Sequence, residues 1–363
     1  MHSSQRSLPT RPGGDARTRA GACLRALPAV LLAAALGSLL AACGPAPDKA
    51  ATAAGTPAAT QPVSLVLGDQ VRMTRALVEA SGAFDGIPYR IEWANFQGAA
   101  PLFEALKADA VDTAPAGDSP TLAAAAAGVA FRIVAVSTAS PRGIAIVVPP
   151  DSGVRSVADL AGREVVVSSA RGSISHYQLL GALREAGVPL ASVKLSFLLP
   201  VDALTAFRAG HIGIWATFDP YLASAEIGGA RVLRDGAGIN SGHGYLTVSA
   251  RALADPAKRA ALADVLQRLA RAQAWRNANP EAYTALYAQI TGLAPDIAAR
   301  VISRGRHELQ PVNAAAIDSL RRVAEVYAEE KLLPQDIDVA ALFDDSLFPP
   351  ATSTAATTSA ASR

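Results

Sequence analysis

The sequence comprises 363 residues, of which half are apolar and 18% are charged, with a formal net charge of +2 at pH 7. The apolar fraction and low net charge exclude a disordered chain, and the length provides for about two domains with ample core-forming residues. No basic stretch interleaved with aromatic residues is present, which excludes a nucleic-acid-binding surface. Two cysteines, Cys23 and Cys43, exclude a disulfide framework.

The first 42 residues have the layout of an export signal. Residues 26–42 carry no charge, Arg25 precedes them, and the run is too short to cross a hydrocarbon core of ~30 Å. Leu40 to Cys43 resembles the bacterial lipobox, in which Cys43 receives a diacylglycerol and becomes the first residue of the mature protein. A buried N-terminal helix is the alternative interpretation. Without this leader 28 basic and 30 acidic residues remain, so the basic balance comes from the leader.

Two further segments lack apolar periodicity. Residues 43–62 are rich in Ala, Pro and Thr, which predicts a flexible tether, and residues 346–363 end in an Ala/Ser/Thr run that predicts a disordered tail.

Between these segments the patterns alternate between strand and helix. In chain order they predict strand 63–67, helix 71–80, strand 89–93, helix 101–107, strand 111–114, an Ala-rich helix from Ser119 to Gly128, and strands 133–136 and 144–148. Ser119 as N-cap and Pro120 as the first helical residue are helix-start signals.

The second half continues the alternation and then becomes helical. Next come strand 165–167, a helix from Gly172-Ser173 to Ala186, strand 193–198, helix 202–209, strand 212–217 and a helix opening at Asp219-Pro220. Residues 252–330 are nearly all helical, with breaks at Asn279-Pro280, Gly292 and Gln310-Pro311. This alternation predicts an α/β fold on mostly parallel sheets.

One internal repeat supports a two-lobed arrangement. Residues 104–118 align without gaps to residues 205–219, and each copy reads as helix, turn, strand and an acid before a proline-containing helix start. The repeat indicates two similar lobes that present matching elements to one cleft. Two ordinary αβ units are the alternative.

Motifs for several enzyme classes are absent. The sequence contains no G-x-G-x-x-G after a strand, no P-loop, no H-E-x-x-H and no G-x-S-x-G. Ser173 and Ser175 lie beside His176, but this spacing at a helix start does not form a catalytic triad. Asp69, Asp118 and Asp219 lie near strand ends, where a helix cap or turn is the usual role of an acid.

The chain resembles the periplasmic solute-binding proteins of ABC importers, in the aliphatic sulfonate branch of the sulfonate, nitrate and taurine group. The resemblance covers residues 63–340 and rests on six stretches in order: 93–101, 116–120, 157–162, 172–176, 215–221 and 242–246.

This resemblance implies the type II periplasmic-binding fold, with two lobes and a cleft between them. Residues 63–142 plus 245–345 would form one lobe and residues 143–244 the other. It implies a lipid-anchored monomer in the periplasm or at the outer cell surface that delivers a small organic anion to a permease with its ATPase. No cofactor, metal or nucleic-acid partner is expected.

Eleven residues are expected to bind the ligand. They are Gln97, Gly98, Asp118, Ser119, Arg171, Gly172, Ser173, His176, Trp215, Asp219 and Tyr245.

Each candidate has a physical role to test. Helix starts at Ser119 and at Gly172-Ser173 offer N–H groups to an anion from both lobes. Arg171 offers a charge-assisted bond. Trp215 would form an apolar wall for the carbon chain, and the Tyr245 hydroxyl would close over the ligand. Core packing for Trp215 remains the alternative.

Others have weaker assignments. Gln97 offers an amide donor. Asp219 is expected as a helix cap or hinge contact more than as a ligand contact, and packing is as good an interpretation as contact for His176.

Several residues depart from the family pattern, which leaves the ligand open. Ala108 replaces a Gly, Gly213 replaces an Asp, and Ile174 replaces a polar residue. Arg171 occupies a loop that usually has small or polar residues, with a Lys near that position. Nitrate, taurine, an aromatic sulfonate or a thiamine-precursor pyrimidine are the alternative ligands. An enzyme of the same fold, such as a menaquinone-pathway dehydratase, is the alternative class, because fold alone does not decide function.

Overall fold

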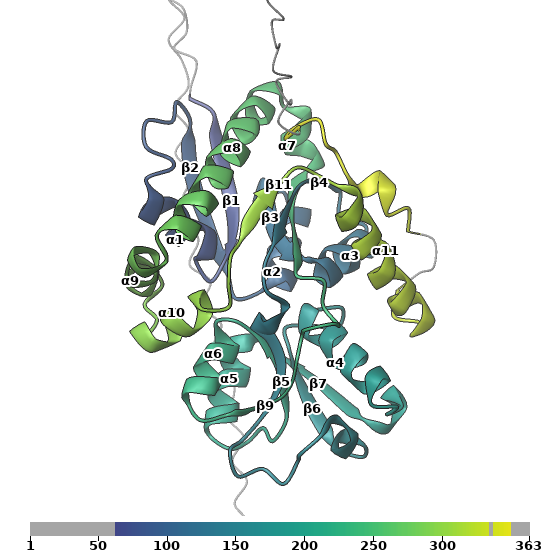
Figure 1. The fold of residues 1–363 in the computed structure, drawn as a ribbon. Helices are drawn as coiled ribbons and strands as arrows, with labels where there is room; N and C mark the ends of the chain where they lie inside the picture. Colours follow the sequence, from purple (N-terminus) through teal and green to yellow (C-terminus); the bar gives the residue numbers. More distant parts are fainter. Residues whose placement is uncertain (1–61, 334–336, 350–363) are drawn as a thin grey trace, which may run out of the picture. The chain divides into compact units, whose positions relative to one another are not determined.

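The computed structural model describes residues 62–333 and 337–349, which belong to one compact unit (Figure 1). The predicted leader with Cys43, the predicted tether up to residue 61 and the tail from residue 350 lie outside the described residues. Within the described ranges, no helix combines the length and apolarity needed to cross a bilayer.

Six strands form the first sheet, in the order β11–β4–β10–β3–β1–β2. Their bounds are β1 Ser64–Gln70, β2 Arg90–Phe96, β3 Thr113–Gly117, β4 Phe131–Thr138, β10 His243–Ser249 and β11 Glu308–Gln310. Strand β1 pairs in parallel with β2 and β3, whereas β10 runs antiparallel to β3 and β4, and β11 antiparallel to β4.

Eight helices accompany this sheet in the chain. They are α1 Met73–Ser81, α2 Ala99–Lys107, α3 Asp118–Ala126, α7 Ala250–Ala254, α8 Pro256–Ala278, α9 Pro280–Thr291, α10 Pro295–Ile302 and α11 Ala314–Glu329.

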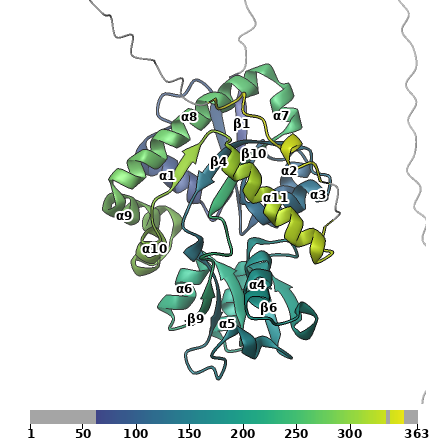
Figure 2. The same ribbon diagram turned by 45° about the vertical axis from the view of Figure 1, so that its right-hand side comes forward.

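Five strands form the second sheet, in the order β7–β6–β8–β5–β9. Its elements are β5 Ile144–Val148, β6 Glu164–Ser168, β7 Lys194–Leu198, β8 Trp215–Phe218, β9 Arg231–Asp235, α4 Ile174–Glu185, α5 Pro200–Arg208 and α6 Tyr221–Ile227. Short 3-10 turns lie at η1 Pro141–Gly143, η2 Val157–Leu160, η3 Leu190–Ser192 and η4 Ala340–Leu342. In both ribbon views these elements, apart from η4, gather below those of the first sheet (Figures 1 and 2).

The chain passes between the sheets twice, at 139–143 and at 236–242. The two crossings are hydrogen-bonded to each other, because Ala139 N–H donates to the Gly242 carbonyl at 2.8 Å. Gly242 has φ +77°, and a Cβ there would collide with the Ala139 carbonyl, so the close approach requires glycine. The lobe boundaries expected at 142/143 and 244/245 lie at or beside these crossings.

Both sheets are mixed, although the α/β fold class is as predicted. Strands β5 and β10, which directly follow the two crossings, run antiparallel to their neighbours. The sequence pattern did not predict β9, β10 or β11 as strands. Strand β11 has only three residues and interrupts a region that otherwise reads as helix.

The two copies of the internal repeat occupy different sheets. One copy contributes α2 and β3 to the first sheet, and the other contributes α5 and β8 to the second. Each copy ends at an acid, Asp118 at the start of α3 and Asp219 shortly before α6. The expected N-cap of α3 is wrong by two residues, because Gly117 occupies that position and Ser119 lies inside the helix.

Apolar clusters cover both faces of each sheet. The second sheet is packed on one face by a cluster around Leu160 and Leu179 and on the other by a cluster around Trp215 and Leu222. The predicted tail begins too early, since Leu347 and Phe348 are 4% and 5% exposed and pack into the core of the first sheet. Burial of these two apolar side chains stabilises the end of the chain up to Phe348, although the residues that follow are mostly Ala, Ser and Thr.

Candidate functional site

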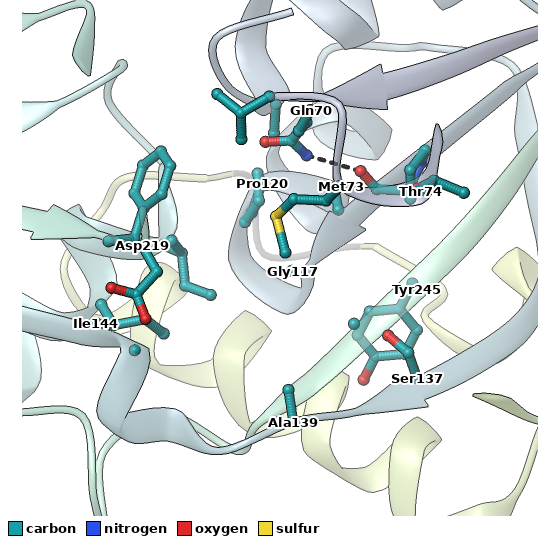
Figure 3. Close-up of a pocket in the computed structure, with 18 of the residues that line it drawn as sticks. Gln70, Met73, Thr74, Gly117, Pro120, Ser137, Ala139, Ile144, Asp219 and Tyr245 are labelled. Carbon is teal, nitrogen blue, oxygen red and sulfur yellow. Dashed lines mark hydrogen bonds between the residues drawn. The ribbon is translucent and has the colours of Figure 1, made fainter. Parts of the chain in front are cut away.

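A cavity of about 550 Å³ lies between the two sheets and is lined from both. Its wall includes segments that follow the carboxyl ends of β1, β3, β6 and β8, which is where α/β folds place ligands. Figure 3 shows Asp219 and Ile144 of the second sheet on one side and Gln70 and Met73 on another. Apolar side chains dominate the lining, so the cavity suits a partly hydrocarbon ligand.

The start of helix α2 faces this cavity without a capping side chain. Gly98 is its N-cap and makes no side-chain cap bond, and the first turn holds no acidic residue. Ala99 and Ala100, the first two helical residues, line the cavity. N–H groups at a helix start have no partner within the helix and carry partial positive charge. The start of α2 is therefore suited to receive an anion.

Ser169 faces the start of α2 from the second sheet. A Cβ placed on Gly98 would lie 3.4 Å from Ser169 Oγ, which shows how closely the two segments approach. Ser169 is 9% exposed and lines the cavity, and its hydroxyl has no hydrogen-bond partner among the described residues. Its φ of 76° lies in the left-handed region, which is unusual for serine.

Sequence reasoning missed Ser169, Ala99 and Ala100. A signal for Ser169 was present, because it follows a buried strand directly and therefore lies at the carboxyl edge of the sheet. The alanines carry no chemical signal, since only their backbone N–H groups matter.

The structure places Arg171, Gly172 and Ser173 in the cavity wall. Arg171 is exposed, and its guanidinium carbon lies 5.6 Å from the centre of the Phe197 ring. Gly172 N–H donates to His176 Nδ1 at 3.1 Å, and Ser173 Oγ donates to the Ser168 carbonyl at 2.9 Å. Two hydrogen-bond donors at the start of α4 are therefore used within the protein, so fewer donors than expected are available to a ligand.

Ser119 does not line the cavity, so the expected anion position between the starts of α3 and α4 needs correction. The Ile174 side chain fills that space, because a Cβ on Gly117 would lie 2.6 Å from Ile174 Cδ1. A Cβ on Gly172, where φ is +82°, would lie 2.8 Å from Ala123 Cβ of α3. The two helix starts therefore pack directly against each other.

Asp118 is not part of the cavity wall either. It is 1% exposed and accepts hydrogen bonds from Ser119 N–H and from Ser241 Oγ, both at 2.7 Å. Burial raises its pKa, and these two bonds oppose that rise. Its role is to tie the start of α3 to the loop before β10.

Gln97 and Gly98 lie beside the cavity rather than in its lining. The Gln97 carbonyl accepts a hydrogen bond from Tyr221 Oη at 3.3 Å, and the side-chain Oε1 is buried with no partner in the described structure.

His176 is buried behind the α4 turn. Its ring is 0% exposed, lies 5.4 Å from Phe197 and 6.4 Å from Tyr327 between ring centres, and does not line the cavity. Burial, and then the charge of Arg171, lowers its pKa to about 4. His176 is thus a neutral acceptor that holds the Gly172 backbone, which is the packing role that the sequence left open.

Trp215 does not form the expected wall. It is 0% exposed, packs 5.5 Å from Phe207 between ring centres, and donates from Nε1 to Ser168 Oγ at 2.9 Å. Its side chain lies on the face of the second sheet that α5 and α6 cover, so it belongs to the core. Phe218, at the end of the same strand, lines the cavity instead.

Asp219 lines the cavity but is already paired. Arg304 contacts its carboxylate at 2.9 Å and 3.3 Å, and Ala223 N–H donates to it at 3.1 Å. Burial raises the Asp219 pKa, and Arg304 opposes this. Arg304 also contacts Glu226 at 2.5 Å, so this cluster joins the second sheet to the end of α10.

Tyr245 contributes its ring to the cavity and not its hydroxyl. It is 1% exposed, and Oη donates to the Ala316 carbonyl at 2.8 Å. The expectation that this hydroxyl closes over the ligand is therefore wrong.

The comparisons with known proteins agree with this architecture. Residues 46–291 match the model of the NMT1-like family. A protein of Escherichia coli (strain K12), provisionally named an aliphatic sulfonates-binding protein, is 35% identical over 69% of this chain and 78% of its own length. A protein of Bacillus subtilis (strain 168) with the same provisional name is 25% identical over 73% of this chain and 80% of its own length.

Solved structures show the same likeness. The alkanesulfonate-binding protein SsuA from Xanthomonas axonopodis pv. citri, bound to MOPS, superposes with a TM-score of 0.73 and 28% identity, covering 79% of this chain and 99% of that one. The periplasmic aliphatic sulphonate binding protein SsuA from Escherichia coli superposes with a TM-score of 0.68 and 29% identity, covering 78% of this chain and 92% of that one. The desulfurization enzyme DSZB, at 16% identity, shares the fold alone. The chain thus belongs to the NMT1-like family, with the binding-protein fold that its sequence predicted.

Proposed function

We propose that this protein is the substrate-binding component of an ABC importer and that it binds an aliphatic sulfonate in the cavity between the two sheets. The observation that carries the proposal is the uncapped start of α2 opposite the unpartnered Ser169 hydroxyl, beside an apolar cavity. The relatives named as sulfonate-binding proteins support the same ligand class.

A sulfonate fits this chemistry because it is a permanent anion with three acceptor oxygens. The N–H groups of Ala99 and Ala100 and the Ser169 hydroxyl are donors from opposite sides of the cavity. Hydrogen bonds to a charged group contribute roughly 1.5–3 kcal/mol each. Three of them, with burial of a short carbon chain at ~0.8 kcal/mol per methylene, reach the ~8 kcal/mol of a micromolar complex.

Binding without chemistry is the better-supported role, because Asp69 and Asp219, two carboxylates of the cavity lining, are already engaged within the protein. Asp69 accepts three backbone N–H groups around the start of α1, at 2.8 to 3.0 Å, and Asp219 is paired with Arg304. The buried His176 is held as a neutral acceptor. None of these groups is free to act as a general base on a ligand.

Delivery to a membrane permease would use the two crossing segments as a hinge. Hinge closure of two lobes around a ligand is a common conformational change in binding proteins, and it distinguishes the ligand-bound protein from the free one. The ion pairs of Arg304 with Asp219 and Glu226 join the two sides away from the crossings.

Lipid anchoring at Cys43 is part of the proposal and rests on the sequence alone, since this residue lies outside the described structure. The experiment is Cys43→Ser in cells. We expect the protein to leave the membrane fraction or to remain uncut. A wild-type mature protein that begins elsewhere and carries no lipid would refute the anchor.

The ligand is tested by thermal shift followed by calorimetry on the purified protein. The panel contains alkanesulfonates of increasing chain length, taurine, nitrate and sulfate. We expect micromolar binding that tightens with chain length, and no comparable binding of nitrate or sulfate. Equal affinity for nitrate and alkanesulfonates would reject the sulfonate assignment.

A further inference from the structure

One part of the cavity lining comes from four helices, α1, α8, α9 and α10. Helix α8 contributes Leu269, Gln273 and Arg276, which lie three or four residues apart and so share one helix face. Tyr283 and Tyr287 of α9, Met73 and Leu77 of α1, and Val301 and Ile302 of α10 complete the lining. We call this region the α8–α9 chamber.

Arg276 in this chamber is a buried cation without an anionic partner. It is 6% exposed, and its guanidinium takes part in no ion pair or hydrogen bond with any described residue. Its guanidinium carbon lies 5.2 Å from the centre of the Tyr283 ring. Burial lowers the pKa of Arg276, and the tyrosines oppose this only in part. A buried charge is usually paired, because desolvation costs several kcal/mol.

Two further polar atoms of the chamber also lack partners. Tyr287 is 1% exposed and its hydroxyl makes no hydrogen bond, and Gln273 Oε1 is buried and unpartnered, within the part of the chain that is described. His307, which also lines the cavity, has its pKa lowered to about 3 by burial and by the Arg276 charge. Unpartnered buried polar groups around one cavity indicate a missing ligand group.

The nearby acids do not neutralise Arg276. Asp69 holds the start of α1 with both carboxylate oxygens, and Asp219 is paired with Arg304. A short alkanesulfonate would leave part of the cavity unfilled, because the cavity volume of about 550 Å³ is within the range of sites for drug-sized ligands.

We propose that the α8–α9 chamber binds a second anionic group of the ligand through Arg276 and Tyr287, so that the protein selects sulfonates with a sulfonate or carboxylate at the far end of the carbon chain. The proposal rests on the proposed function, because it places the first sulfonate at the α2 start. An arginine fork offers two parallel donors to such a group.

The experiment compares monosulfonates with α,ω-disulfonates of the same length by calorimetry. Butane, hexane and octane derivatives are the probes. For the wild-type protein, the disulfonate that best spans the cavity should bind at least ~tenfold more tightly than its monosulfonate. Arg276→Met should reduce this ratio to about one while monosulfonate binding stays intact, and Arg276→Lys should retain part of it.

Two further variants separate the chamber from general effects. Arg271→Met removes an exposed arginine of the same helix, and the ratio should not change. Tyr287→Phe removes the unpartnered hydroxyl and should lower the ratio by roughly threefold to tenfold. Thermal stability of ligand-free Arg276→Met should equal or exceed that of the wild type, because an unpaired buried charge is removed.

The outcomes distinguish the two proposals. Wild-type protein that binds monosulfonates as tightly as every disulfonate refutes the chamber and leaves the sulfonate-binding function standing. The chamber is also refuted if the preference for the disulfonate over the monosulfonate persists in Arg276→Met, or if Arg271→Met reduces that preference as much as Arg276→Met does. Failure of both ligand series to bind overturns the proposed function itself. If Arg276→Met does not fold, the wild-type ratio and the Tyr287→Phe variant decide.

Discussion

Two aromatic residues of strand β8 should respond in opposite ways to truncation. Phe218 lines the cavity and packs edge-on against Tyr221 at 5.8 Å between ring centres, whereas Trp215 is 0% exposed in the core. We expect Phe218→Ala to weaken long-chain sulfonates, because the carbon chain loses its apolar wall. Trp215→Ala should instead weaken the fold, because it leaves a large cavity in the second sheet.

The magnitudes follow from these positions. Two or three methylenes against the Phe218 ring, at ~0.8 kcal/mol each, give about 2 kcal/mol or roughly thirtyfold in Kd. Methanesulfonate has no chain to bury and should lose almost nothing. Trp215→Ala should cost about 3–5 kcal/mol of unfolding free energy, as large aromatic truncations in cores do.

Calorimetry with a chain-length series and urea denaturation of both variants make the test. The expected pattern is a chain-length-dependent loss of affinity in Phe218→Ala, and in Trp215→Ala a loss of stability with unchanged chain-length selectivity. If Trp215→Ala instead abolishes selectivity for long chains while stability holds, the assignment of Phe218 as the wall is wrong.

Three further perturbations test other parts of the site. Gly172→Ala should destabilise the protein by more than backbone strain alone, since its Cβ would lie 2.8 Å from Ala123 Cβ of α3. Gly162→Ala is the control: it has a similar φ of +75° with nothing within 4 Å, so it should cost only backbone strain of about 1–2 kcal/mol, and equal losses in urea denaturation would contradict the close packing. Arg304→Met leaves the carboxylate of Asp219 buried and unpaired, so denaturation should show a loss of about 3–5 kcal/mol, and a loss below 1 kcal/mol would contradict a structural pair. The pKa of His176 is about 4 against an ordinary value of 6.5, so its contribution to stability is complete above pH 6.5 and declines by about 1.4 kcal/mol per pH unit as the pH falls toward 4. His176→Gln should flatten this pH dependence of the unfolding free energy in urea denaturation, and an unchanged slope would refute the assignment of a buried neutral His176.

The sequence predicted the fold class because its signals are local. Continuous apolar runs such as 144–148 were assigned with the bounds that the structure shows. The internal repeat located α2–β3 and α5–β8, which the structure places in different sheets. Strands β9, β10 and β11 were missed. Strand β11 has only three residues, and β10 pairs with β3 and β4, which lie far earlier in the chain.

The site was harder to predict because a cavity depends on which side of an element each residue faces. Trp215 and Phe218 are three residues apart on one strand, yet one packs in the core and the other lines the cavity. Ser119 is absent from the cavity lining for the same reason, and the Ile174 side chain fills the space between the helix starts. Arg276 gave no signal in the sequence, because only the packing of α8 against α9 buries it.

The most direct test is a crystal structure of the protein with hexanesulfonate. We expect the sulfonate oxygens to lie within hydrogen-bond distance of the N–H groups of Ala99 and Ala100 and of Ser169 Oγ, with the carbon chain against Phe218. A sulfonate bound away from the start of α2, or a ligand outside the cavity between the two sheets, would contradict it.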